Sequence, residues 1–148
     1  KYLAEFEDLE SRELKNELDG LKKDYTSGRI KMFCLHRALL SRQEISGIFK
    51  TGDYIPLEVQ GEMAEKVLAF ARTDGEKSAI VVVPVMVVNL FTEELQVKDL
   101  TQDLKVLLPD NLKGTFENIF TGEEIPSGEI AVKDLFTNFP VALLKLKT

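Results

Sequence analysis

The most constraining feature of the sequence is a change in the spacing of its apolar residues near position 52. Over residues 1–51, apolar side chains recur every third or fourth position among charged ones, and no proline precedes Pro56. From Asp53 onward, apolar and polar residues alternate. The first spacing is typical of amphipathic helices and the second of half-buried strands. The sequence therefore predicts a helical segment over residues 1–51 and an all-β domain over residues 52–148.

The helical segment is expected to contain two helices. Gly20 is expected to end the first as a C-cap, and the second is expected to begin after Ser27-Gly28 and to end near Gly47. Apolar residues occupy more than half of the girth of the second helix, which indicates neighbours on several sides.

The first strands are predicted from alternation and turn residues. Strands are expected from Asp53 to Val59 and over Val67–Arg72, joined across a turn at Gln60 to Glu62 as a hairpin. Asp74-Gly75 is suited to the tight turn that follows, because both residues tolerate positive φ. The next run is apolar on both faces, which indicates a central strand; it should break at Pro84 and continue irregularly.

Short strands and turns fill the rest of the chain. The segment from Thr92 to Gln102 suits a loop or a helical turn, and a turn of helix is expected over Val132–Phe136. Strands are expected at Leu104 to Leu108, Gly114 to Thr121, around Pro126 and Gly128, and at Pro140 to Leu146. This pattern predicts a mainly β protein: an antiparallel β-sandwich preceded by the helical segment.

Charge and composition narrow the class of protein. The chain has 148 residues, of which 44% are hydrophobic and 30% charged, enough apolar material for a core. Its net charge is −6 and its basic residues are scattered, so neither nucleic acid nor an anionic membrane surface is expected as a partner. The longest apolar run contains Pro84 and is too short to span a bilayer.

Cys34 is the only cysteine, so no intramolecular disulfide is possible, and no signal peptide is visible. A cytoplasmic location is therefore expected. The chain opens at Lys1 without an initiator Met, which suggests a piece of a longer protein.

No residue stands out as catalytic. His36 is the only histidine, so neither a metal cluster nor a zinc site is expected, and Cys34 is interpreted as a buried, inert thiol. The adjacent pairs Glu93-Glu94 and Glu123-Glu124 fall in loops that fix no working distance between carboxylates. Phosphate-binding glycine loops and nucleophile elbows are absent from the sequence. The predicted set of catalytic residues, metal ligands and cofactors is therefore empty.

Sugar binding is the remaining chemistry to consider, because aromatic rings stack on sugar faces. The chain has no Trp, three Tyr and nine Phe, most of them in core-like patterns. Phe49 and Tyr54 are the candidates for an exposed, substrate-binding platform, although placement in the core is favoured for both.

An ordered set of segments resembles the C-terminal region of the maltooligosyl trehalose synthase family, within the α-amylase superfamily (glycoside hydrolase family 13). The segments are SGRIKMFCLHRALLSRQE, IFKTGDYIPLEV, KVLAFART and IVVVP, followed by LLP, IFTGEEI and FPVALLKL. Together they cover roughly residues 21–148. A neighbouring glucanotransferase of the superfamily is the alternative relative.

The resemblance implies a fold and a partner. The helix around Arg37 and Arg42 would be the last helix of a (β/α)8 barrel, and Gly52-Asp53-Tyr54 would open the accessory β-domain. Such enzymes convert the reducing-end α-1,4 linkage of a maltooligosaccharide to α,α-1,1 by intramolecular transglucosylation, with catalytic carboxylates on the barrel. None of the catalytic motifs occurs here, so the expected partners are the missing barrel of the same polypeptide and its maltooligosaccharide. The helices, separated from that barrel, should expose apolar side chains.

Two other hypotheses remain open. The chain would act as a stand-alone carbohydrate-binding module if it carried an exposed aromatic row. It would act as a protein-interaction domain if its amphipathic N-terminal helix served as the partner surface.

Overall fold

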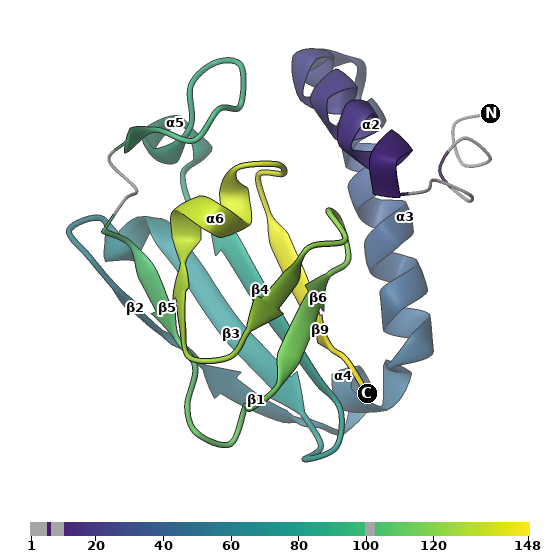
Figure 1. The fold of residues 1–148 in the computed structure, drawn as a ribbon, viewed down its shortest axis with the longest axis vertical. Coiled ribbons are helices and arrows are strands. Elements are labelled where there is room, and N and C mark those ends of the chain that lie inside the picture. Colours follow the sequence, from purple (N-terminus) through teal and green to yellow (C-terminus); the bar gives the residue numbers. More distant parts are fainter. Residues whose placement is uncertain (1–5, 7–10, 100–102) are drawn as a thin grey trace.

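The computed structural model describes residue 6 and the ranges 11–99 and 103–148 (Figure 1). Its N-terminal part is helical, as predicted. The helices are α2 (Ser11–Lys23), the 3-10 turn η1 (Tyr25–Ser27), α3 (Arg29–Glu44) and α4 (Ser46–Lys50). None of the helices in the described ranges is long and apolar enough to cross a membrane.

Glycine positions explain where these helices break. The expected C-cap at Gly20 is wrong, because α2 continues through it to Lys23. The chain reverses at Gly28 instead, where a φ of 82° requires the left-handed conformation that glycine adopts at little cost. Helix α3 begins directly after it, as expected, and ends before Gly47, which lies inside α4.

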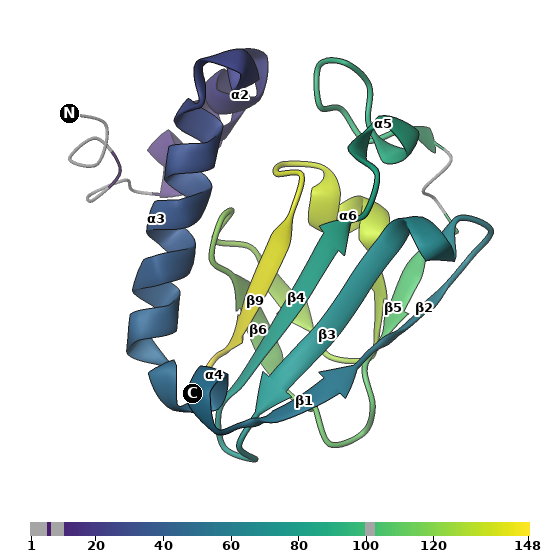
Figure 2. The same ribbon diagram turned by 180° about the vertical axis from the view of Figure 1, so that it is seen from behind.

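The β-domain is built from two open antiparallel sheets, which confirms the predicted sandwich-like class (Figures 1 and 2). The six-stranded sheet has the order β1 (Asp53–Pro56), β3 (Val67–Thr73), β4 (Ser78–Pro84), β9 (Ala142–Leu146), β6 (Thr115–Asn118) and β7 (Glu124–Pro126). The three-stranded sheet has the order β2 (Glu58–Gln60), β5 (Lys105–Leu107) and β8 (Glu129–Ala131).

The predicted first strand is divided between the two sheets. β1 pairs with β3, whereas β2 pairs with β5, and Leu57 lies between them with its side chain in the core. The expected hairpin is therefore correct for β1 and β3 and wrong for β2. Gly61, at a φ of 126°, makes the predicted turn after β2.

Strands β3 and β4 form the central hairpin of the large sheet. Its turn is at Asp74 and Gly75, as predicted; Gly75 has a φ of 92°. The Asp74 carboxylate accepts hydrogen bonds from the backbone N–H groups of Glu76 (3.1 Å) and Lys77 (2.8 Å). Strand β4 ends at Pro84, as the sequence indicates.

The 3-10 turn η2 (Ala64–Lys66), between β2 and β3, and two short helices complete the described elements. The helical turn α6 (Val132–Phe136) lies where it is predicted. A further turn, α5 (Val87–Leu90), forms directly after β4, where an irregular segment is expected. The described part of Thr92 to Gln102 forms a loop closed by a bridge between Phe91 and Val97, and its last residues lie outside the described ranges.

Successive side chains of β4 and β9 point to opposite faces of the large sheet and so enter two different cores. Ile80 and Leu144 point between the two sheets, into a core that includes Phe116 and Phe136. Ala79 and Leu143 point to the other face, where α2, α3 and α4 pack. The large sheet is thus buried on both faces where α3 runs beside it (Figure 2).

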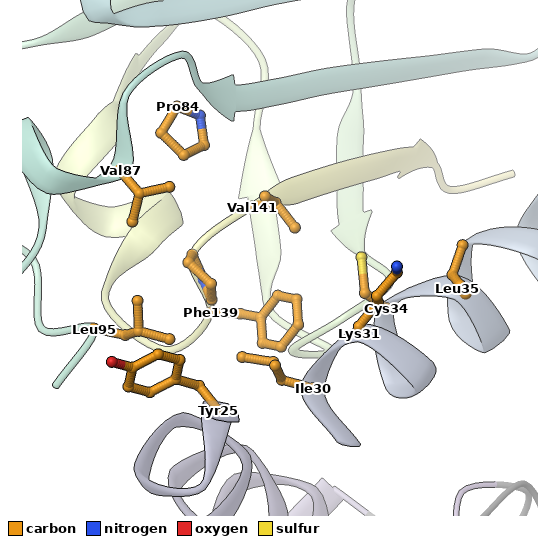
Figure 3. Close-up of a pocket in the computed structure, with 11 residues that line it drawn as sticks. Tyr25, Ile30, Lys31, Cys34, Leu35, Pro84, Val87, Leu95, Phe139 and Val141 are labelled. Carbon is orange, nitrogen blue, oxygen red and sulfur yellow. The ribbon is translucent and has the colours of Figure 1, made fainter. Parts of the chain in front are cut away.

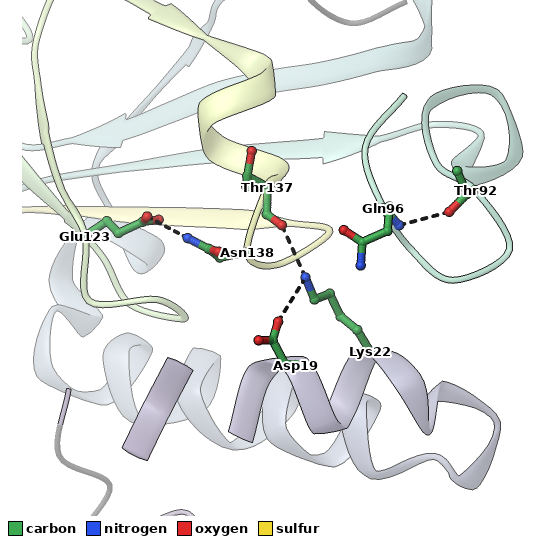
Figure 4. A network of polar contacts seen from close by, with 7 residues as sticks. All are labelled: Asp19, Lys22, Thr92, Gln96, Glu123, Thr137 and Asn138. Atoms are coloured by element: carbon green, nitrogen blue, oxygen red, sulfur yellow. Dashed lines mark hydrogen bonds and ion pairs between the residues drawn. The ribbon is translucent and has the colours of Figure 1, made fainter. Parts of the chain in front are cut away.

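Helix α2 is also tied to the β-domain by a buried lysine. The Nζ of Lys22 donates to the carbonyl of Thr137 (3.2 Å) and lies 3.5 Å from the carboxylate of Asp19 (Figure 4). A lysine with its side chain this deeply buried requires such partners. The chain changes from helix to strand between Lys50 and Asp53, and the division into domains at residues 51 and 52 stays a prediction.

Candidate functional site

One side of α3 exposes a row of apolar side chains. Met32, Leu35, Leu39 and Leu40 recur at helical spacing, and Leu39 is 59% exposed. Together with His36 and Gln43 they line a groove of about 360 Å³. The opposite side of the helix buries Phe33 completely, so α3 is apolar on both sides. This confirms the expectation that the helical segment exposes apolar side chains.

A second apolar groove has a volume of about 330 Å³, and Figure 3 shows the residues that line it. Tyr25, Ile30 and Leu35 line it from the helical side, and Pro84 and Val87 line it from the end of β4 and from α5. Leu35 belongs to both grooves, so they form one continuous surface.

The segment after β4 extends this surface. Four consecutive apolar residues are exposed there, Val85, Met86, Val87 and Val88, the last to 70%. Because a folded chain rarely exposes a large contiguous apolar patch without a partner, the combined surface is a candidate docking site. We define the docking face as Tyr25, Met32, Leu35, Leu39, Leu40 and residues 85–88.

The docking face offers little polar chemistry. Lys31 is the charged residue at the second groove, and the half-buried Cys34 supplies a thiol whose pKa is raised by burial. A raised pKa keeps the thiol protonated and unreactive near neutral pH, in agreement with the inert cysteine expected from the sequence.

His36 lies in the α3 groove, with its ring centroid 6.4 Å from that of Phe6. Its Nδ1 is buried and has no hydrogen-bond partner among the described residues. The described ranges also contain no group of three His, Cys, Asp or Glu residues that could hold a metal ion.

The two candidate aromatic residues occupy different environments. Phe49 is half-buried against the helix–sheet core, as favoured from the sequence. Core placement is wrong for Tyr54, which is 52% exposed on the outer face of β1. Its ring stacks on Phe70, with centroids 5.0 Å apart and planes at 29°. In the β1–β3 register, Tyr54 lies opposite Arg72 and Pro56 opposite Phe70, so Tyr54 and Phe70 are diagonal neighbours. The sequence alone does not reveal this register, and the pairing is therefore missed. Binding of substrate by either residue stays a prediction.

The carboxylates of Glu123 and Glu124 have separate partners. Glu123 accepts from the Nδ2 of Asn138 (2.7 Å), whereas Glu124 pairs with Lys147 (Figure 4 for Glu123). Glu93 and Glu94 are exposed in the loop after α5.

Comparison with solved structures gives a specific match. Part of maltooligosyltrehalose synthase from Arthrobacter ramosus is similar to this chain, with a TM-score of 0.63 and 28% sequence identity. A single-residue mutant of the same enzyme matches with a TM-score of 0.63 and 27% identity. Each match covers 90% of this chain and 16% of the synthase chain. No family model matches this chain, and no curated protein matches its sequence.

Proposed function

We propose that this chain is a non-catalytic C-terminal domain of an enzyme resembling maltooligosyltrehalose synthase. Such an enzyme converts the reducing-end α-1,4 linkage of maltooligosaccharides to α,α-1,1 and belongs to trehalose biosynthesis and to glycoside hydrolase family 13. The support is the structural resemblance together with size: the match spans 16% of the synthase, and a (β/α)8 barrel needs about 250 residues. The catalytic carboxylates would lie elsewhere in the polypeptide.

The docking face is the observation that supports a role in packing against the catalytic barrel. Helix α3 buries one side against the β-domain and leaves Leu35, Leu39 and Leu40 exposed on another. A helix that is apolar around most of its girth is stable when elements cover it on several sides. The partner that fits is the catalytic barrel of the same polypeptide, against which α3 and residues 85–88 would pack. The domain would thereby shield apolar surface of the barrel.

This role assigns maltooligosaccharide as the substrate of the whole enzyme and the cytoplasm as its location. The net charge of −6 agrees with the absence of nucleic acid and membrane from the proposed partners.

A chimera tests the proposal. The matched part of the Arthrobacter ramosus synthase is replaced by this chain, and conversion of maltopentaose to its trehalosyl product is measured. The chimera is expected to retain conversion, and the same chimera carrying Leu35→Glu and Leu39→Glu is expected to lose it, because two carboxylates would be buried at the junction. The isolated chain should give no product; clear turnover by the isolated chain would overturn the proposal.

The alternative is a stand-alone carbohydrate-binding or protein-interaction β-domain. The observation that favours sugar binding is the exposed ring of Tyr54 stacked on Phe70. A Tyr54→Ala variant that abolishes saturable maltooligosaccharide binding by the isolated chain would support this alternative.

A further inference from the structure

A polar niche lies where the second half of α3 faces strands β6 and β9. Its volume is about 180 Å³. The residues around it come from three elements far apart in the sequence: Arg37, Leu40, Ser41 and Glu44 on α3, Glu117 and Ile119 at the end of β6, and Lys145 on β9. The niche shares Leu40 with the docking face but is otherwise separate from it.

Arg37 is positioned at this niche by one hydrogen bond and one ring contact. Its Nε donates to the carbonyl of Ile119 (2.9 Å), and its guanidinium lies 5.9 Å from the ring centroid of Phe33. Burial lowers the pKa of Arg37, while the nearby carboxylates of Glu117 and Glu44 raise it. Among the described residues, Ile119 is the only acceptor for Arg37, so the two Nη groups remain available to a ligand.

Ser41 adds a buried hydroxyl to the same niche. The residue is 4% exposed, and its Oγ has no hydrogen-bond partner among the described residues. A buried hydroxyl without a partner costs free energy, so a ligand that supplies one gains that energy on binding.

Glu117 contributes an acceptor. It lies directly opposite Lys145 in the β6–β9 register, yet Lys145 pairs with Glu44, at 2.6 Å. No cation of the described residues is within ion-pair distance of Glu117. The niche therefore combines donors and acceptors, and its two carboxylates are balanced by Arg37 and Lys145.

We propose that this niche binds one hexose ring of a neutral saccharide. Vicinal hydroxyls both donate and accept, so they match the carboxylate of Glu117, the Nη groups of Arg37 and the Oγ of Ser41. A volume of about 180 Å³ limits the ligand to a small molecule such as a single ring. Leu40 and Ile119 supply apolar contact for the ring face. A charged ligand would disturb the balance between the two carboxylates and the two cations of the niche.

The experiment is an NMR titration of the isotopically labelled 148-residue chain with glucose and with maltose. Saturable shifts with a Kd of millimolar order are expected at the backbone amides of Ser41, Glu44 and Glu117, because an open niche forms few contacts. Glucuronate and glucosamine, which keep the hexose ring and carry a negative and a positive charge, are expected to bind more weakly.

Two variants and one control locate the site. Ser41→Ala removes a hydroxyl, and Glu117→Gln replaces a charged acceptor with a neutral amide. Each is expected to weaken glucose binding about fivefold or more. Glu129→Gln changes an exposed carboxylate outside the niche and should leave the Kd unchanged. Dispersion of the amide spectrum shows that each variant is folded.

Three results would overturn the proposal: no saturable shift with either sugar, shifts centred on Tyr54 and Phe70, or unchanged binding by both niche variants. The niche is tested separately from the proposed function, because sugar binding by the chain is measured without any catalytic assay. A chimera that converts maltopentaose while the niche binds no sugar would leave the synthase-domain role intact and remove the niche alone.

Discussion

Phe33 of α3 meets Phe139, just before β9, edge to face, with ring centroids 5.5 Å apart and planes at 64°. Both side chains are fully buried, and Phe139 also stacks on Phe120. Such aromatic contacts dominate the energetics of a small core. The helical segment is therefore joined to the outer face of the large sheet by a shared core, and the two parts should unfold together.

Replacing Phe33 tests this shared core. Phe33→Ala is expected to lower the free energy of unfolding by about 3–5 kcal/mol, because it removes a buried ring and leaves a cavity. Met32→Ala, next to it on the exposed side of α3, should change the stability little. Urea unfolding followed by circular dichroism measures both, and separate transitions for helices and strands in the parent chain would contradict a single core.

Gly52 joins the helical segment to β1 at a point with no room for a side chain. A Cβ there would lie 2.6 Å from the carbonyl oxygen of Ile48 and 2.9 Å from that of Thr73. Gly52→Ala is therefore expected to destabilise the chain by roughly 1–3 kcal/mol. Gly47→Ala is the control: nothing lies within 4 Å of its Cβ position, and alanine favours the helix. Equal melting temperatures for the two variants would show that the junction is not tight.

The central hairpin should depend on pH through Asp74. Hydrogen bonds from the backbone N–H groups of Lys77 and Glu76 lower the pKa of its carboxyl. A carboxyl with a lowered folded-state pKa stabilises the fold above its unfolded pKa, and this stabilisation is lost as pH falls through the folded-state pKa. Asp74→Ala should therefore be less stable than the parent at neutral pH, with a difference that narrows in acid.

Chemical unfolding of parent and variant, repeated from neutral to acid pH, measures that difference. Glu76→Gln removes a charge from the same turn without removing the side-chain acceptor of Asp74, and should show no comparable narrowing. A gap between parent and Asp74→Ala that stays constant with pH would exclude the hydrogen-bonded carboxylate as its source.

The docking face should make the isolated chain bind apolar dyes or self-associate. Leu35→Glu and Leu39→Glu are expected to reduce dye fluorescence and association while leaving the unfolding free energy nearly unchanged, because both side chains are exposed. Arg42→Gln is the matched control for each single variant, since it also lowers the net charge by one on the same helix. Sedimentation velocity and a dye titration suffice, and a dye-inert, monomeric parent chain would count against the docking face.

The sequence predicts the fold best where local chemistry decides it. The turn at Asp74 and Gly75 and the start of α3 after Gly28 follow from residues that tolerate positive φ. Gly20 misleads because glycine marks a helix end only when the chain turns there, and here the turn occurs eight residues later at Gly28.

Tertiary pairing explains what the sequence does not predict. The division of the first strand at Leu57 depends on the pairing of β2 with β5, which lies more than forty residues away. The docking face joins residues of α3 to residues 85–88 across the fold, so no local pattern brings them together. The stacking of Tyr54 on Phe70 likewise follows from strand register rather than from composition.

The most direct measurement is the nucleotide sequence of the gene on the 5′ side of the codon for Lys1. If the chain is an accessory domain of a synthase-like enzyme, the reading frame continues upstream through a (β/α)8 barrel, about 250 residues or more, that contains catalytic carboxylates. A start codon directly before Lys1, or an upstream frame that encodes no barrel, would contradict that role and leave the chain to act on its own.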